Sequence, residues 1–141
     1  MTQQSTAQAL AAVLVAHRDQ LIDTLVQQAP AAGPEYAQST PEQLRPRLAL
    51  VVDACIASIA QDQPTLLAGF MQAAAESRVR EGYALDSLIM LAMFTEGALS
   101  DTAEIAFEDQ PEQRETARHL IRRLIAAAEG VINGMMSSDV G

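Results

Sequence analysis

The sequence predicts an all-α protein, and three of its features lead to that prediction. Apolar residues recur at three- and four-residue intervals along almost the whole chain. Sustained alternation of polar residues with branched or aromatic ones, which is the pattern of strands, is missing. Prolines stand where helices would begin, and segments rich in glycine or proline separate the apolar stretches. We therefore expect a single domain over residues 1–141, built as a bundle of about five helices.

The first helix is expected over residues 5–28. Ser5 or Thr6 could cap its free amide groups. One face carries an apolar stripe, which consists of Leu10, Val13, Leu14, His17, Leu21 and Leu25. The helix stops before "APAAGPEYAQST", which is predicted to be a loop because proline, glycine and small residues favour turns.

The second helix has the clearest start signal in the chain. In "STPEQLRPRL", Thr40 can cap the helix, and Pro41 takes the first helical position, where its missing N–H is not needed. Gln43 can complete a capping box with Thr40. The third helix begins at Pro64 and ends before Gly82, which can take the left-handed conformation of a helix exit.

The last two expected helices carry the most continuous apolar residues in the chain. The fourth is expected over residues 84–109, and the fifth begins at Pro111 and carries a wide apolar stripe as far as Met135. Five helices joined mostly by short turns favour an antiparallel bundle or a globin-like packing.

Composition excludes several classes of partner. The chain has 9 basic and 18 acidic residues, a net charge of −9. Such an acidic protein repels phosphate backbones and anionic lipid surfaces, so we expect neither nucleic acid nor a membrane as partner.

The single cysteine excludes an internal disulfide and suggests a reducing compartment. No leader pattern or long apolar run is present, so we expect a soluble, cytoplasmic protein.

The candidates for metal binding and catalysis are few. His17 and His119 are the only histidines, and neither stands in the glutamate-histidine spacing of a di-iron bundle, so we expect no metal site. His17 lies on an apolar stripe, where a core or interface histidine is the simpler interpretation and a haem or ligand-pocket role is the alternative. His119 is expected at a solvated edge. Cys55 is predicted to be a buried, inert thiol with a raised pKa.

An enzymatic function lacks a visible apparatus. The chain has no nucleophile elbow and no phosphate-binding glycine loop. A helical enzyme using Glu76, Glu96 or Asp101 remains an alternative, but nothing in the sequence brings two of them together with a partner base. We expect no catalytic residues and no cofactor.

A stripe of arginines marks the fifth helix. Its members are Arg114, Arg118, Arg122 and Arg123, with Glu112 and Glu115 interleaved. An ion-paired, solvated face is one interpretation, because oppositely charged residues three or four positions apart pair on a helix. An acidic protein partner is the other.

Residues 87–94, "SLIMLAMF", are apolar on every side of the fourth helix. A helix that is hydrophobic all round is buried all round, by the core, by a second subunit or by a ligand. The predicted interface of a homodimer consists of Leu88, Met90, Leu91, Met93, Leu124 and Val131. The predicted ligand pocket, which is the alternative, is formed by His17, Phe70 and Phe94.

The junction between the third and fourth helices resembles helical input domains of bacterial regulators. The matching residues are Arg78, Arg80, Glu81, Gly82, Leu85, Leu88 and Leu91. With them the chain resembles the N-terminal sensor domain of RsbR-type stressosome co-antagonists, and a similar corner precedes the output domains of sugar-diacid and purine-catabolism regulators. Ala84 departs from the pattern, because such corners often carry a hydroxyl helix cap there.

The resemblance implies a function in bacterial signal transduction. RsbR-type sensor domains are globin-like, bind no haem, dimerise and pass a signal to a C-terminal phosphorylatable STAS domain. No STAS sequence follows here, so the chain is expected to be a free-standing sensor or a piece of a longer protein. We therefore expect a homodimeric regulatory domain with a possible protein partner, and a small-ligand-binding domain is the alternative.

Overall fold

The computed structural model describes residues 3–140, and side chains from Thr6 to Ser137. This part of the chain is helical and contains no strand, which confirms the all-α prediction. The elements are α1 (Gln3–Ala16), α2 (Arg18–Gln28), the 3₁₀ helix η1 (Ala29–Ala31), α3 (Pro34–Ala37), α4 (Pro41–Ala60), α5 (Pro64–Arg80), α6 (Leu85–Ala106) and α7 (Pro111–Val140).

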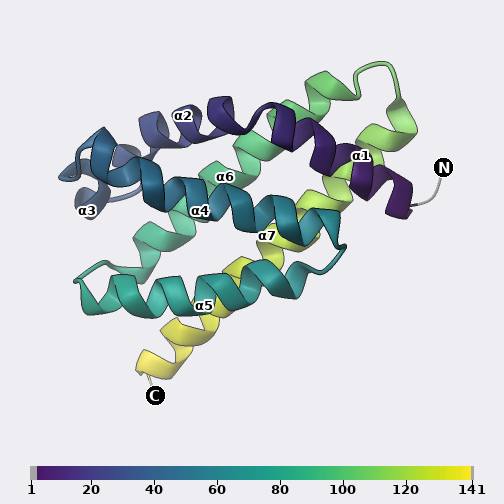
Figure 1. The fold of residues 1–141 in the computed structure, drawn as a ribbon. Helices are drawn as coiled ribbons and strands as arrows, with labels where there is room; N and C mark the ends of the chain where they lie inside the picture. Colours follow the sequence, from purple (N-terminus) through teal and green to yellow (C-terminus); the bar gives the residue numbers. More distant parts are fainter. Residues whose placement is uncertain (1–2, 141) are drawn as a thin grey trace.

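The long helices form two crossing layers (Figure 1). Helices α4 and α5 run side by side in front, and α1 and α2 lie along the other side of α4. Helices α6 and α7 cross behind them, and α7 packs against both α5 and α6. Leucine, isoleucine and valine side chains from both layers form one buried core. Among the described residues, no helix combines the length and apolarity that a membrane crossing needs.

The predicted helix over residues 5–28 is wrong in one respect, because it is broken at His17. His17 has φ −109° and ψ 15°, and its backbone N–H is shared between the carbonyls of Val13 (3.1 Å) and Leu14 (3.2 Å). The ring Nδ1 also lies 2.9 Å from the Val13 carbonyl oxygen. A side chain that bonds a backbone acceptor one turn back competes with the regular helix ladder. The chain bends there, and both Leu14 and Leu21 remain buried.

The predicted loop before the second helix also contains structure. Pro30 lies in η1 and Pro34 opens α3, because proline preorganises the first turn of a helix. Together with the break at His17, these elements correct the expected five helices to seven α-helices and one 3₁₀ helix within residues 3–140.

The predicted start of α4 is confirmed. The Gln43 backbone N–H donates to Thr40 Oγ1 at 3.2 Å, and the Thr40 N–H donates to Gln43 Oε1 at 2.9 Å. This reciprocal pair is a capping box, with Pro41 at the first helical position.

The predicted helix exit at Gly82 is confirmed as well. Gly82 has φ +97°, a left-handed value that disfavours any residue with a Cβ. Its N–H donates to the Val79 carbonyl at 3.0 Å, and the Tyr83 N–H donates to the Arg78 carbonyl at 2.9 Å. These two bonds form a Schellman motif, which fixes the direction in which α6 leaves α5.

Replacing Gly82 with valine is expected to lower the free energy of unfolding by about 1–2 kcal/mol, because a branched side chain is strained at this φ. No atom lies within 4 Å of a Cβ built at Gly82, so the loss would come from the backbone alone. Urea denaturation followed by circular dichroism measures it. Gly69→Val is the matched control, because Gly69 lies within α5 and is equally open, and we expect that variant to be near neutral. Equal losses in both variants would contradict the strain argument.

The cap that Ala84 lacks is supplied by another helix. Glu35 of α3 accepts a bond from the Ser87 hydroxyl at 2.8 Å and one from the Ala84 backbone N–H at 3.3 Å. A bond to its own backbone N–H, followed by the bonds from Ser87 and Ala84, lowers the pKa of the Glu35 carboxyl. The start of α6 is therefore held by a tertiary contact with α3 rather than by a local cap.

Candidate ligand-binding site

A cavity of about 300 Å³ lies between α4 and α5, with α6 beneath it. Helix α4 contributes leucine and valine side chains such as Leu48 and Val51, and α5 contributes Phe70, Met71 and three alanines. Leu88 of α6 closes the deep side. Apart from the polar groups at one end, the lining is therefore apolar.

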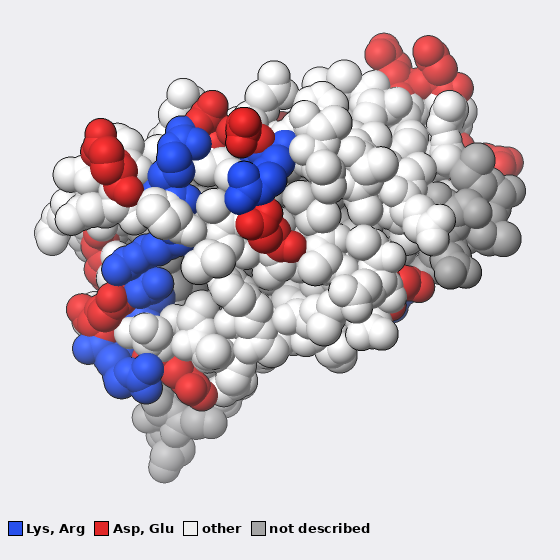
Figure 2. Space-filling model, in the orientation of Figure 1, with Lys and Arg blue, Asp and Glu red and all other residues white. Residues whose placement is uncertain are grey.

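The polar groups of the cavity lie at one end, the end that is farther from the turn between α4 and α5. The two helices are antiparallel, and Arg47 and Arg78 lie about equally far from the turn along their helices, so they face each other. Val51 and Phe70 lie closer to the turn. The cavity therefore has a cationic end and an apolar end. On the face seen in Figure 2, charged side chains of both signs gather toward the left, and the area beside them is largely uncharged.

One carboxylate bridges the two arginines. Arg47 Nη2 donates to Glu81 Oε1 at 3.2 Å, and Arg78 donates to the other oxygen of Glu81. These bonds, with that from Arg78 the largest effect, lower the pKa of Glu81. Arg47 Nη1 also donates to the Tyr83 hydroxyl at 3.1 Å. The two guanidinium groups line this end of the cavity, whereas Glu81 lies beside it.

Two tyrosines complete the polar end. The rings of Tyr36 and Tyr83 meet edge to face with centroids 5.1 Å apart, and the Arg78 guanidinium lies 6.0 Å from the Tyr83 centroid. Tyr36 is buried, and burial raises its pKa, so it stays un-ionised at neutral pH.

A smaller void continues the apolar end into the core. It has a volume of about 20 Å³, shares Val51, Met71 and Leu88 with the cavity, and reaches Cys55. Cys55 is fully buried, and burial raises the pKa of its thiol to about 12. This confirms the prediction of a buried thiol with a raised pKa.

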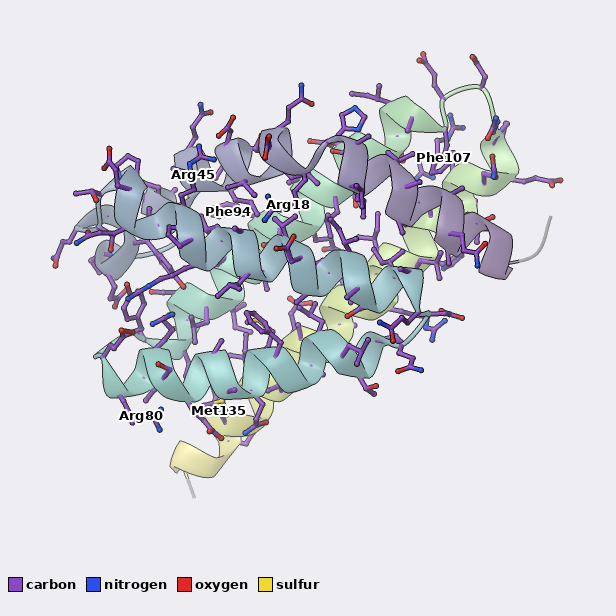
Figure 3. All side chains as sticks on the ribbon, viewed as in Figure 1. Arg18, Arg45, Arg80, Phe94, Phe107 and Met135 are labelled. Atoms are coloured by element: carbon purple, nitrogen blue, oxygen red, sulfur yellow. The ribbon has the colours of Figure 1, made fainter. Side chains whose placement is uncertain are left out.

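The three residues of the predicted pocket lie apart. Phe70 lines the cavity, whereas His17 lines a separate surface hollow with its sequence neighbours. Phe94 comes from α6, is partly buried against the core and lines neither space (Figure 3). The sequence reasoning missed Arg47, whose spacing of three residues from Leu44 and four from Val51 places it at the edge of the buried stripe of α4.

The six residues of the predicted interface divide between the core and the surface. Leu88, Leu91 and Leu124 are buried within the chain. Met90 and Met93 are exposed, at 36% and 50% of their surface. Val131 is half-buried. The apolar run of α6 thus presents one face to the core and another to solvent.

The arginine stripe of α7 is an ion-paired face, as one of its two interpretations predicted. Arg118 Nε lies 2.5 Å from Glu104, and Arg122 Nη1 lies 2.6 Å from Glu96, so both arginines tie α7 to α6. The other members also have acidic partners, at 3.8 Å for Arg114 and 4.0 Å for Arg123. Exposed pairs of this kind contribute little stability.

The remaining candidates lie at the surface. His119 is exposed, as predicted, and its Nε2 lies 3.7 Å from Glu115. Glu96 is held by Arg122, Glu76 accepts a bond from Gln72 at 2.8 Å, and Asp101 is exposed. In the described part of the chain, no group of three or more histidine, cysteine or acidic side chains could hold a metal ion.

Comparison of the chain with protein-family models, with curated proteins and with solved structures gave no match. The likeness to RsbR-type sensor domains therefore depends on the residues of the α5–α6 corner.

Proposed function

We propose that this chain is a regulatory sensor domain that binds a small, largely apolar molecule between α4 and α5. The observation that supports this function is the cavity of about 300 Å³, whose volume is at the lower end of the range for small-molecule sites, about 300–1,000 Å³. Such sites are mostly apolar and carry a few polar groups that orient the ligand. This cavity has that composition.

The position of the cavity suggests how binding would be passed on. Its cationic end includes Arg78 and Glu81, which belong to the α5–α6 corner. Helix α6 packs along α7, which also contacts α5. A ligand that moves α5 relative to α4 would therefore act on α6 and α7. Helix α7 corresponds to the output element that the RsbR-type resemblance implies. The globin-like packing and the cytoplasmic location are part of the same proposal.

Filling the cavity is expected to abolish binding. The probe is N-phenyl-1-naphthylamine, a neutral apolar dye whose fluorescence rises when it leaves water. We expect saturable binding to the wild-type chain, and a loss of about tenfold or more in affinity for Ala74→Trp, whose indole would occupy the space. Ala126→Trp places the same side chain on an exposed position of α7 and should change nothing. Unchanged binding in Ala74→Trp, or no binding to the wild type, would contradict the proposed function.

A second candidate function, homodimerisation, is favoured by the exposed face of α6. Met90 and Met93 are exposed at a spacing of three residues, and Gly97 follows one turn later on the same face. Methionine side chains adapt to a partner surface, and a glycine allows close approach of a second helix. This face is the exposed part of the predicted dimer interface.

The dimer is tested by sedimentation equilibrium at about ten to one hundred micromolar. We expect a dimer for the wild type and a monomer for Met93→Glu, because an uncompensated charge in an apolar interface is strongly unfavourable. Val15→Glu changes an equally exposed apolar residue of α1 and should leave the dimer intact. A monomeric wild type would remove this candidate and leave the ligand-binding proposal untouched.

A further inference from the structure

The chemistry of the cavity points to a class of ligand, and this inference rests on the proposed ligand-binding function. We propose that the site takes an amphipathic monocarboxylate. Its apolar tail would lie between α4 and α5, and its carboxylate would bind the guanidinium groups of Arg47 and Arg78.

The charged residues of the cavity lining are Arg47 and Arg78. Glu81, which the two arginines share, and Glu35, which acts on Tyr36, lie beside the cavity and do not line it. The chain as a whole carries a net charge of −9, so this cationic end stands out against an acidic protein. The two guanidinium groups that line the cavity would attract a carboxylate, whereas they would repel an ammonium group.

The two arginines also have free donors in a suitable geometry. A guanidinium group carries more N–H donors than Arg47 and Arg78 use in their bonds to Tyr83 and Glu81. Its planar fork matches the two oxygens of a carboxylate. Glu81 itself demonstrates that one carboxylate can bond to both arginines through separate oxygens. Because the Glu81 side chain is 39% exposed, it can turn to water when a ligand carboxylate arrives.

The apolar part of the cavity is long enough for an extended tail. Phe70 and Arg78 are eight residues apart on α5, which corresponds to about 12 Å along the helix axis. Val51 and Leu88 line this length, and the smaller void continues it toward Cys55. An extended medium-chain tail would bury apolar surface along this path, and the hydrophobic effect would supply most of its affinity. Arg80, by contrast, projects away from the bundle at the end of α5 (Figure 3) and does not line the cavity.

The chain carries its own reporter of the polar end. Tyr36 and Tyr83 are its only tyrosines, and it contains no tryptophan. Tyr36 lines the cavity, and Tyr83 contacts both Tyr36 and Arg47. Binding of a carboxylate beside Arg47 should therefore change the tyrosine fluorescence, whereas binding elsewhere on the protein should not.

The experiment compares three ligands with the same tail, namely decanoate, 1-decanol and decylammonium. The two ions are kept below their micelle concentrations, and decanol is kept below its solubility limit. Isothermal titration calorimetry gives the affinities, and tyrosine fluorescence gives the location. We expect decanoate to bind about tenfold more tightly than decanol, which is the factor that one additional charge-assisted hydrogen bond supplies. Decylammonium should bind most weakly.

Two variants change the head-group site in opposite directions. Arg47→Gln should remove the advantage of decanoate over decanol. Glu81→Gln should strengthen decanoate binding severalfold, because it removes the competing carboxylate. Arg45→Gln is the matched control, because Arg45 lies on the same helix, pairs with Asp23 and does not line the cavity. The Glu81 variant keeps the inference testable if Arg47→Gln fails to fold.

The outcomes separate this inference from the function on which it rests. Equal affinities for decanoate and decanol, with no effect of Arg47→Gln, would mean that the arginines and Glu81 only brace α4 against the α5–α6 corner. The ligand class would then be wrong, and the apolar site would stand. If the neutral dye and all three amphiphiles fail to bind, the proposed function itself is wrong.

Discussion

Replacing Leu124 with alanine is expected to lower the free energy of unfolding by about 2–5 kcal/mol, the range for a fully buried leucine. Leu124 has 1% of its surface exposed and lies on α7, which packs against both α5 and α6. Truncation there removes apolar contacts and leaves a cavity at the crossing of the two layers. Urea denaturation followed by circular dichroism measures the loss.

The matched comparison is Met93→Ala, which truncates another member of the predicted interface. Met93 is 50% exposed, so we expect a loss below about 1 kcal/mol at low protein concentration. A loss as large as that of Leu124→Ala would show that the face of α6 around Met93 is covered. If that loss depended on protein concentration, the cover would be a second copy of the chain.

The sequence predicted those features of the fold that depend on a few neighbouring residues. The capping box of Thr40 and Gln43 and the left-handed exit at Gly82 each involve residues close together in the chain, and both are confirmed. The break at His17 was missed because the apolar spacing continues through it. Leu14 and Leu21 keep a helical repeat, although the backbone between them leaves the helix.

The candidate site was less accessible to sequence reasoning because it depends on tertiary contacts. Phe70 was predicted as a pocket residue, but its neighbours in the cavity come from separate helices. Nothing local to Tyr36, Arg47 or Arg78 indicates that the three line one space. The apolar run in α6 was predicted to be buried all round, by the core, by a second subunit or by a ligand. Within the chain only one face of it is buried, because the helix lies at the edge of the bundle, where Met93 faces solvent, and periodicity does not reveal this position.

The contact between α3 and the start of α6 leads to the second large effect. Gly33 has φ 172°, an extended value that any residue can adopt, so its backbone does not require glycine. Its surroundings do, because a Cβ at this position would lie 2.1 Å from Ser87 Oγ and 2.8 Å from both Ser87 Cβ and Glu35 Oε2. Gly33→Ala is therefore expected to cost about 1–3 kcal/mol, the range for overpacking. Urea denaturation measures this loss as well.

A double-mutant cycle with Ser87→Gly tests the cause of that loss. Ser87→Gly alone removes the bond to Glu35 and places a glycine in the first turn of α6, so it should be destabilising. It also removes two of the three atoms that a Cβ on residue 33 would meet, and it releases the third, Glu35 Oε2, from its bond to Ser87. Gly33→Ala should therefore cost much less in the Ser87→Gly background, with a coupling energy of about 1–2 kcal/mol. Additive losses would mean that α3 and α6 can separate freely. The bonds from Glu35 would then not fix the start of α6, the helix that lines the deep side of the cavity.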